Sequence, residues 1–232
     1  MIDSLYDIFK KWSEKGSVYI YSDPHFSDLE SFEFRKANNK LPENVECVEV
    51  LDYYQIQSIN KVVSKNDTLI ILGDVGDIEK IKKLKAGYKV LLLGNHDRGA
   101  GYYKRNLIKE TSSMWIEGVQ HKFETLVPNE TDNKLFDEVY SGPLMISDKI
   151  ILSHEPIIPC PDYLVNLCGH VHAKPHKFKE NKIQYYNFCA EAIDYKPVSL
   201  GELIKKGLLS KVKDIHRVTV DGAIIRKNKR KS

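Results

Sequence analysis

Short apolar runs recur along this chain and end close to polar residues. Each run is rich in leucine, aromatic and β-branched residues, a composition typical of buried strands. Asp23, Asp74 and Asn95 follow the first three runs, so these strands are predicted to end beside side chains that can bind a cation. The predicted strands span residues 18–21, 68–72, 90–93, 150–152, 163–168 and 183–188.

Other segments carry helical or turn patterns. Apolar residues recur at helical spacing in residues 4–15 and 48–63, which predicts an N-terminal helix packed on the domain and a second helix returning to the sheet. Residues 27–42 are rich in charge, Asn and Phe; they predict a surface loop, either a specificity element near the mouth of a site or a plain linker. An Asp-Gly pair within residues 215–225 predicts a β-hairpin.

The composition indicates one compact unit with a basic tail. With 232 residues and 42% hydrophobic content, the chain can bury a full core in a single domain, which we assign to residues 1–225. Residues 226–232 contain five positive charges, and without them the formal net charge of +3 becomes −2. The domain therefore lacks the excess positive charge that favours nucleic acid. We expect a disordered tail, with weak attraction to phosphate backbones as the alternative.

The sequence favours a cytoplasmic protein. The four cysteines show no Cys-x-x-Cys spacing and are expected to be buried free thiols in a reducing compartment. No stretch approaches the ~20 apolar residues of a membrane span, and the first residues lack the basic and apolar regions of a secretory signal. We therefore expect no membrane partner, and the sequence leaves the oligomeric state open.

Five short motifs in a fixed order carry the candidate chemistry. They are Asp-Pro-His at 23–25, Gly-Asp with a further Asp at 73–77, Gly-Asn-His-Asp at 94–97, His154, and Gly-His-Val-His at 169–172. Five of the eight histidines fall inside this series, which argues against incidental placement. Imidazole, carboxylate and amide groups form a mixed ligand set for divalent transition ions. Two such ions roughly 3.5 to 4 Å apart, bridged by one carboxylate, can activate water and hold a phosphoryl group.

This order of motifs resembles the calcineurin-like metallophosphoesterase family over residues 23–172. The resemblance implies an α/β fold, arranged as a four-layer α/β/β/α sandwich, and a centre with two metal ions. Residues 187–200 are similar to the closing segment of small stand-alone members from bacteria and phages. The implied ligands are Asp23, His25, His172 and a bridging Asp74 for one ion, and the same Asp74 with Asn95, His154 and His170 for the other.

The resemblance also implies roles for residues beside the ligands. His96 is expected to sit over the phosphate as a general acid, with Asp97 orienting its ring. Asp77 is expected to give structural support. Arg98 is a candidate phosphate ligand, because a guanidinium group makes paired contacts to phosphate, with solvated surface charge as the alternative.

The implied activity is metal-dependent hydrolysis of a small phosphate ester, in which metal-bound hydroxide attacks phosphorus and His96 protonates the leaving oxygen. A phosphodiesterase is preferred, because an alkoxide leaving group benefits from an acid. The alternatives are a phosphomonoesterase acting on nucleotides or proteins, and a nuclease that uses the basic tail. A non-catalytic binding scaffold is disfavoured because every implied ligand is present. Mn²⁺ is the first choice of ion, and Fe, Zn, Co or Ni also suit the ligands.

Overall fold

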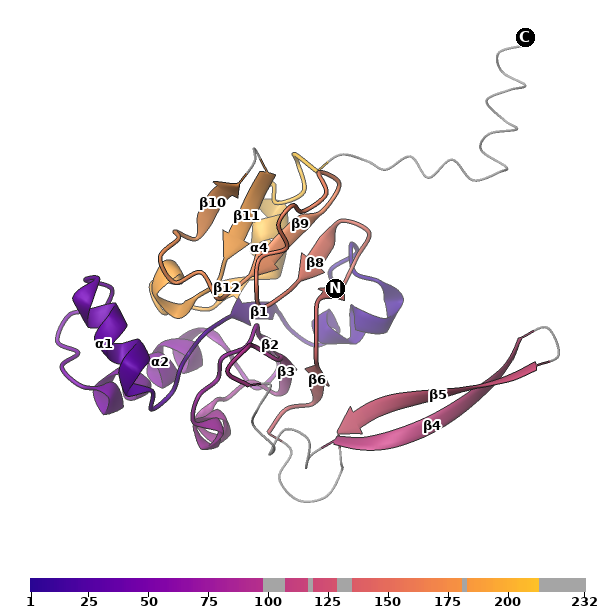
Figure 1. Cartoon of the computed structure of the whole chain (residues 1–232), viewed down its shortest axis with the longest axis horizontal. Helices are drawn as coiled ribbons and strands as arrows, with labels where there is room; N and C mark the ends of the chain where they lie inside the picture. The colour runs from indigo at the N-terminus through magenta and orange to yellow at the C-terminus, as the bar shows by residue number, and fades with distance from the viewer. Residues whose placement is uncertain (98–106, 117–118, 129–134, 181–182, 213–232) are drawn as a thin grey trace, which may run out of the picture.

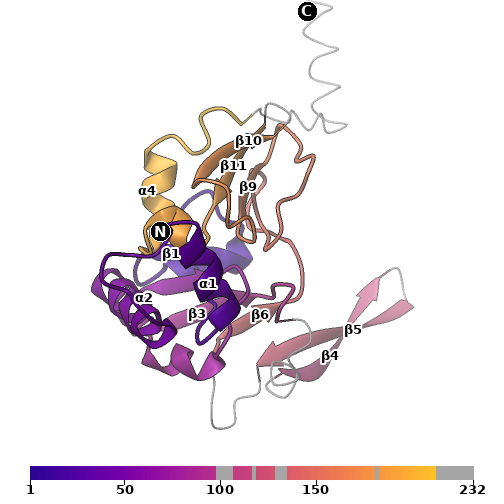
Figure 2. The same cartoon turned by 60° about the vertical axis from the view of Figure 1, so that its left-hand side comes forward.

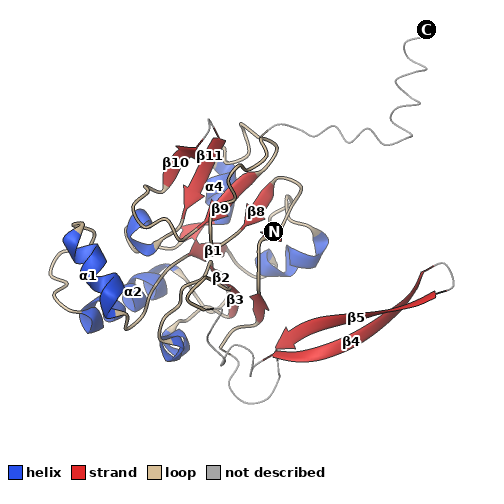
Figure 3. Ribbon diagram, in the orientation of Figure 1, coloured by secondary structure: helices blue, strands red, loops and turns tan. Residues whose placement is uncertain are grey.

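Two β-sheets, the helices around them and a separate pair of strands make up the described part of the chain (Figure 1; Figure 3). The computed structural model describes residues 1–97, 107–116, 119–128, 135–180 and 183–212. Within these residues each sheet has five strands, and a further two-stranded pair stands apart from both. The predicted α/β class is therefore confirmed, with two sheets as the sandwich requires.

The first sheet has the strand order β12-β1-β2-β3-β6. Within this sheet β1, β2, β3 and β6 run parallel to one another, and the edge strand β12 is antiparallel to β1. Parallel strands are covered on both faces and so favour continuous apolar runs; all four residues of β2 are buried. The bounds are β1 (Val18–Tyr21), β2 (Thr68–Ile71), β3 (Tyr88–Leu92), β6 (Glu138–Tyr140) and β12 (Val198–Ser199).

The second sheet has the order β10-β11-β9-β8-β7. Its centre is again parallel, because β8, β9 and β11 run in one direction, while β7 and β10 are antiparallel edges. The predicted strands at residues 150–152, 163–168 and 183–188 are present within a residue or two of their expected ends. The bounds are β7 (Leu144–Met145), β8 (Ile150–Leu152), β9 (Val165–Cys168), β10 (Lys177–Glu180) and β11 (Ile183–Asn187).

The main core draws its side chains from both sheets. Ile20 and Ile70 of the first sheet and Leu152 and Leu167 of the second belong to one buried cluster and are 0% exposed. A second, smaller cluster includes Cys168, the neighbour of Leu167 on β9. Because successive residues of a strand point to opposite faces, β9 separates the two clusters. The sheets therefore face each other across the main core.

The predicted N-terminal helix is present as a 3₁₀ helix, η1 (Asp7–Ser13). It packs on the domain as expected: Phe9 and Trp12 are buried, with their rings 4.7 Å apart. The Trp12 indole N–H donates to Glu138 Oε2 at 3.1 Å. Ile8, in contrast, is 68% exposed, because in a 3₁₀ helix residues three apart share a face and position 8 leaves the face of 9 and 12.

The prediction of a loop over residues 27–42 was wrong, since this segment contains the helix α1 (Leu29–Ala37). Asp28 begins the helix, because its carboxylate accepts a hydrogen bond from Ser31 N at 3.1 Å. Its buried face consists of Phe32 and Arg35. A buried arginine removes the apolar repeat by which a helix is recognised, which is why the pattern predicted a loop.

The second predicted helix is confirmed as α2 (Val48–Val62), whose N-cap is Cys47. Cys47 is exposed, whereas Cys160, Cys168 and Cys189 are buried, and all four are free thiols. The prediction of buried thiols therefore holds for three and is wrong for Cys47. The other helices within the described ranges are η2 (Ile78–Lys83), η3 (Ala190–Ile193) and α4 (Leu200–Lys205).

A long hairpin that the sequence did not predict leads away from the two sheets (Figure 1; Figure 2). Its strands, β4 (Leu107–Ile116) and β5 (Val119–Pro128), pair antiparallel along their whole length. The predicted hairpin at 215–225, the tail at 226–232 and Arg98 lie outside the described residues. Within the described residues, no helix combines the length and the apolar composition that crossing a membrane requires.

Candidate metal centre

The loops that follow five strands converge at the carboxyl ends of the two sheets. The register aligns the ends of β1, β2 and β3 in one sheet and of β8 and β9 in the other, so the residues just beyond them meet at one edge. Four of these residues have a left-handed backbone, which is uncommon for a residue other than glycine and clusters at functional sites. They are Asp23 (φ 53°), His25 (φ 47°), Asp74 (φ 51°) and His170 (φ 65°).

One group of donor atoms is formed by Asp23, His25, His172 and Asp74. His25 Nε2 lies 3.9 Å from Asp23 Oδ1 and 3.7 Å from Asp74 Oδ2. His172 Nε2 lies 3.4 Å from Asp23 Oδ1. Asp23 Oδ1 and His25 Nε2 are buried without a hydrogen-bond partner among the described residues. Such atoms are rare in folded proteins unless a ligand completes them.

A second group is formed by Asp74, Asn95, His154 and His170. His154 Nε2 lies 2.8 Å from Asn95 Oδ1 and 3.3 Å from Asp74 Oδ2. His170 Nδ1 lies 3.0 Å from the same Asn95 oxygen. Asp74 Oδ2 therefore belongs to both groups. The structure brings together all seven residues that the sequence singled out as metal ligands.

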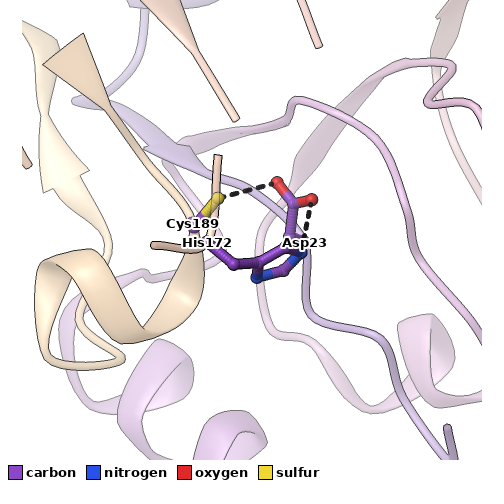
Figure 4. A group of neighbouring side chains, drawn as sticks. All are labelled: Asp23, His172 and Cys189. Carbon is purple, nitrogen blue, oxygen red and sulfur yellow. Dashed lines mark hydrogen bonds and ion pairs between the residues drawn. The ribbon is translucent and has the colours of Figure 1, made fainter. Parts of the chain in front are cut away.

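The two oxygens of Asp23 have different surroundings. Oδ2 accepts hydrogen bonds from the backbone N–H of His170 at 3.0 Å, from the Cys189 thiol at 3.4 Å (Figure 4), and from the Ser22 hydroxyl. Burial raises the pKa of Cys189 well above its usual range, so this thiol stays protonated and acts as a donor. Oδ1 is left to face His25 and His172.

Three imidazoles are oriented through their second nitrogen. His25 Nδ1 lies 2.9 Å from Asp28 Oδ2, and His172 Nδ1 lies 2.5 Å from Glu191 Oε1. His154 Nδ1 donates to the Leu72 carbonyl oxygen at 2.7 Å. In the neutral ring, a proton on Nδ1 leaves the lone pair of Nε2 facing the donor group, as in metal-binding histidines.

The carboxylates set the protonation of two of these rings. Burial lowers the pKa of His154, but the hydrogen bond with Asp74 and the charges of Asp23 and Asp74 outweigh it and raise the pKa to about 9. Burial likewise opposes protonation of His172, whose contacts with Asp23 and Glu191 raise its pKa to about 9. Burial also raises the pKa of Asp23, yet the neighbouring His172 and His154 hold it far below its usual range. The carboxylates of the centre thus stabilise positive charge on the neighbouring rings.

Glycines of the motifs allow the loops to approach. A Cβ atom at Gly94 would meet the Asp74 carboxylate and backbone nitrogen, and one at Gly169 would meet Ser22 Oγ and Asp23 Oδ2. Any side chain at these positions would push the carboxylates out of the groups. The glycines are therefore needed for close approach.

The family resemblance implies that Asp97 orients the His96 ring, which stays a prediction; the structure shows a further task for this carboxylate. Asp97 Oδ2 accepts from the backbone N–H groups of Asp74 (2.8 Å) and Gly94 (2.9 Å), and Oδ1 accepts from Val75 (3.1 Å). These bonds tie together two of the loops that carry donor groups. Asp97 thus fixes the positions of these two loops relative to each other.

His96 lies at the exposed mouth of the centre. Its side chain is 67% exposed, and its Nε2 is 4.0 Å from Asp74 Oδ2. A cavity of about 330 Å³ next to it is lined by residues that include His25, Ser27 and Asp28. Asp77, which also lines this cavity, gives the structural support that was expected, because its carboxylate caps η2 by accepting from Glu79 N at 3.0 Å.

Sequence reasoning missed four supporting residues, namely Asp28, Arg35, Gln55 and Glu191. Gln55 of α2 donates to the Pro24 carbonyl at 3.0 Å and accepts from Tyr21 Oη at 2.8 Å. Only Asp28 had a usable signal, since an Asp before a helical segment is a capping residue. The other three act on segments far from them in the sequence.

Comparisons with known proteins give one family match and two similar solved structures. The family model described as calcineurin-like phosphoesterase matches residues 16–200. A crystal structure described as a protein of unknown function, AQ665 from Aquifex aeolicus, is 22% identical, with 82% of this chain and 98% of that chain covered and a TM-score of 0.52. Vacuolar protein sorting 29 from Cryptosporidium parvum is 13% identical, with 73% and 72% covered and a TM-score of 0.33.

No curated protein sequence matches the chain. The likeness to AQ665 extends to the fold alone, as expected at this level of identity. The family model, however, spans most of the 232 residues and includes every motif described above. The chain therefore belongs to the calcineurin-like phosphoesterase family, a family of metal-dependent phosphoester hydrolases.

Proposed function

We propose that this protein is a phosphodiesterase that works with two divalent ions. The observation that carries the proposal is the sharing of Asp74 Oδ2 between two donor groups, one completed by Asp23, His25 and His172 and the other by Asn95, His154 and His170. A carboxylate between two such groups is the arrangement that a dinuclear centre requires.

The chemistry of the donors fits divalent transition ions. Each group combines imidazole nitrogens with carboxylate or amide oxygens, a set that suits Mn, Fe, Co, Ni or Zn. The unpaired buried atoms Asp23 Oδ1 and His25 Nε2 both belong to the first group, and a cation there would satisfy them. We propose Mn²⁺ as the resident ion.

When bound, the two ions would supply an activated water and would neutralise charge on the phosphoryl oxygens. The protein's own residues divide the remaining work. Asp97 fixes the loops that carry Asp74 and Asn95. The exposed side of the centre, formed by Asn95, His96 and His170, leaves room for the phosphate to approach.

His96 would protonate the oxygen of the departing alcohol. It is exposed beside Asp74 and borders the cavity of about 330 Å³, so a group leaving toward that cavity would pass its ring. An alkoxide is a poor leaving group, and a placed general acid typically contributes about 10²–10⁴-fold. This residue favours diesters, whereas a phosphomonoesterase would use the same donor groups and remains the alternative.

The direct test loads metal-free protein with Mn²⁺, Fe²⁺, Co²⁺, Ni²⁺ or Zn²⁺ and assays matched substrates, bis-nitrophenyl phosphate against nitrophenyl phosphate, followed by cyclic nucleotides. We expect turnover only with added ion, and a higher kcat/KM for the diester. A higher kcat/KM for the monoester would establish the alternative. Absence of turnover with every ion on every ester would reject the proposed function.

Metal binding should release protons in a way that depends on pH. His154 and His172 have their pKa raised to about 9 in the metal-free protein, and ions bind only the deprotonated rings. At pH 7 filling the centre should release about two protons from these rings, and the contribution of the rings should fall toward none above pH 9. Affinity should therefore rise with pH up to that point. Calorimetry in buffers of different ionisation enthalpy measures the count, and a value near zero at pH 7 would contradict the assignment.

A further inference from the structure

We propose that Arg35 is a positioning residue for one of the two ion sites. From helix α1 it would fix His172 through Glu191 and the turn at Asp23 and Pro24, and so maintain the affinity of the site formed by Asp23, His25, His172 and Asp74. This inference rests on the proposed function, because it assumes that ions occupy both donor groups.

The Arg35 guanidinium contacts two separate parts of the chain. Its side chain is 0% exposed, and its Nε donates to Glu191 Oε2 at 3.0 Å. Its Nη2 donates to the Asp23 carbonyl oxygen at 2.6 Å, and its Nη1 donates to the Pro24 carbonyl oxygen at 3.4 Å. The planar fork of an arginine can make these contacts together, which the single ammonium of a lysine cannot.

Glu191 connects this guanidinium to the donor group. Its side chain is also 0% exposed; one oxygen faces Arg35 and the other lies 2.5 Å from His172 Nδ1. A buried carboxylate is stable only when charged partners and hydrogen bonds surround it. Arg35 therefore keeps Glu191 in the position from which it orients the His172 ring.

The turn held by Arg35 is strained. Asp23, His25 and Ser27 have φ values of 53°, 47° and 59°, in the left-handed region that costs energy for residues other than glycine. Such a backbone persists only where its surroundings fix it. The hydrogen bonds from Arg35 to the carbonyls of Asp23 and Pro24 are part of that fixation, along with the one from Gln55 to Pro24.

The same helix supports the third residue of this site. Asp28, the N-cap of α1, accepts from Ser31 N with one oxygen and contacts His25 Nδ1 with the other. Arg35 of α1 thus contacts Asp23 directly and His172 through Glu191, and the N-cap Asp28 contacts His25. These three residues are the ones that the first site does not share with the other site. The second site has a support of its own, the Leu72 carbonyl oxygen for His154, while Asp97 holds the loop of the shared Asp74. Loss of Arg35 should consequently act on one site.

The test compares Mn²⁺ binding to the wild-type protein and to Arg35→Lys, by calorimetry and by electron paramagnetic resonance. In Arg35→Lys we expect one ion to bind about 10–100-fold more weakly, as is typical when a supporting contact is lost, and the other to bind as before. At intermediate Mn²⁺ the spectrum should change from that of a coupled pair to that of a single ion. Lys36→Met is the matched control, because Lys36 is the exposed neighbour on the same helix.

A second variant separates positioning from folding. Arg35→Met with Glu191→Gln removes both buried charges, and so avoids an unpaired carboxylate; it should retain the second site and lose affinity at the first. Equal weakening of both ions, or no change in either, would overturn the role of Arg35 while leaving the proposed function intact. A wild-type protein that binds fewer than two Mn²⁺ ions would instead reject the proposed function itself.

Discussion

Replacing Asp74 with Asn is expected to lower kcat/KM by more than about 100-fold, beyond the 10–100-fold typical of supporting groups. Asp74 Oδ2 is the atom common to both donor groups, 3.7 Å from His25 Nε2 and 3.3 Å from His154 Nε2. An Asn of the same shape can keep the hydrogen bond from His96 N to Oδ1, yet it is neutral and cannot bridge two cations. Bound metal, measured after dialysis, should fall from two ions to one or none.

Asp67→Asn provides the matched control. Asp67 precedes β2 at its amino end, opposite to Asp74, where its carboxylate accepts from Ser17 N at 2.7 Å. This variant should retain both ions and its activity. If Asp74→Asn kept two ions and its rate, the bridging role and the dinuclear proposal would fail together.

Replacing His96 with Ala is expected to reduce kcat by about 10²–10⁴-fold for alkyl phosphodiesters, with both ions retained. The side chain is exposed, and its Nε2 lies 4.0 Å from the nearest oxygen of Asp74, outside the two donor groups. Its backbone N–H, which bonds to Asp74 Oδ1, is unchanged by the substitution. The loss should therefore reflect proton donation alone.

The dependence on the leaving group makes this prediction sharper. A nitrophenolate departs without help from an acid, so nitrophenyl esters should lose much less activity in His96→Ala than alkyl esters do. Measuring kcat across a series of leaving groups checks this directly. An equal loss across the series would assign His96 to phosphate binding rather than to proton transfer.

The strands and donor residues were predictable because each depends on local sequence. A buried parallel strand needs a continuous apolar run, and a polar residue at its end marks the sheet edge; this placed Asp23, Asp74, Asn95 and His154 correctly. The helix α1 was not predicted, because Arg35 occupies its buried face, where the helical pattern requires an apolar residue. Likewise the type of the N-terminal helix could not be read, since α and 3₁₀ helices both place residues three apart on one face.

The supports of the centre were unpredictable for another reason. Arg35 meets Glu191 across 156 positions, and Asp97 serves backbone N–H groups more than 20 positions away. Such pairings are consequences of the assembled fold, and a single sequence carries no local sign of them. The role of Asp97 toward the His96 ring came from the family resemblance, and nothing in the sequence indicated these backbone contacts.

The left-handed backbone at Asp23, His25, Asp74 and His170 limits how this protein could be re-engineered for other ions. Asp, Asn and His tolerate that conformation far better than other residues with side chains, and β-branched residues are poorly suited to it. Few residue types therefore fit these four positions, because the backbone conformation restricts the choice before any preference of the metal is considered. Changes of metal selectivity are more accessible through Asn95, His154 and His172, whose backbones are free of this restriction.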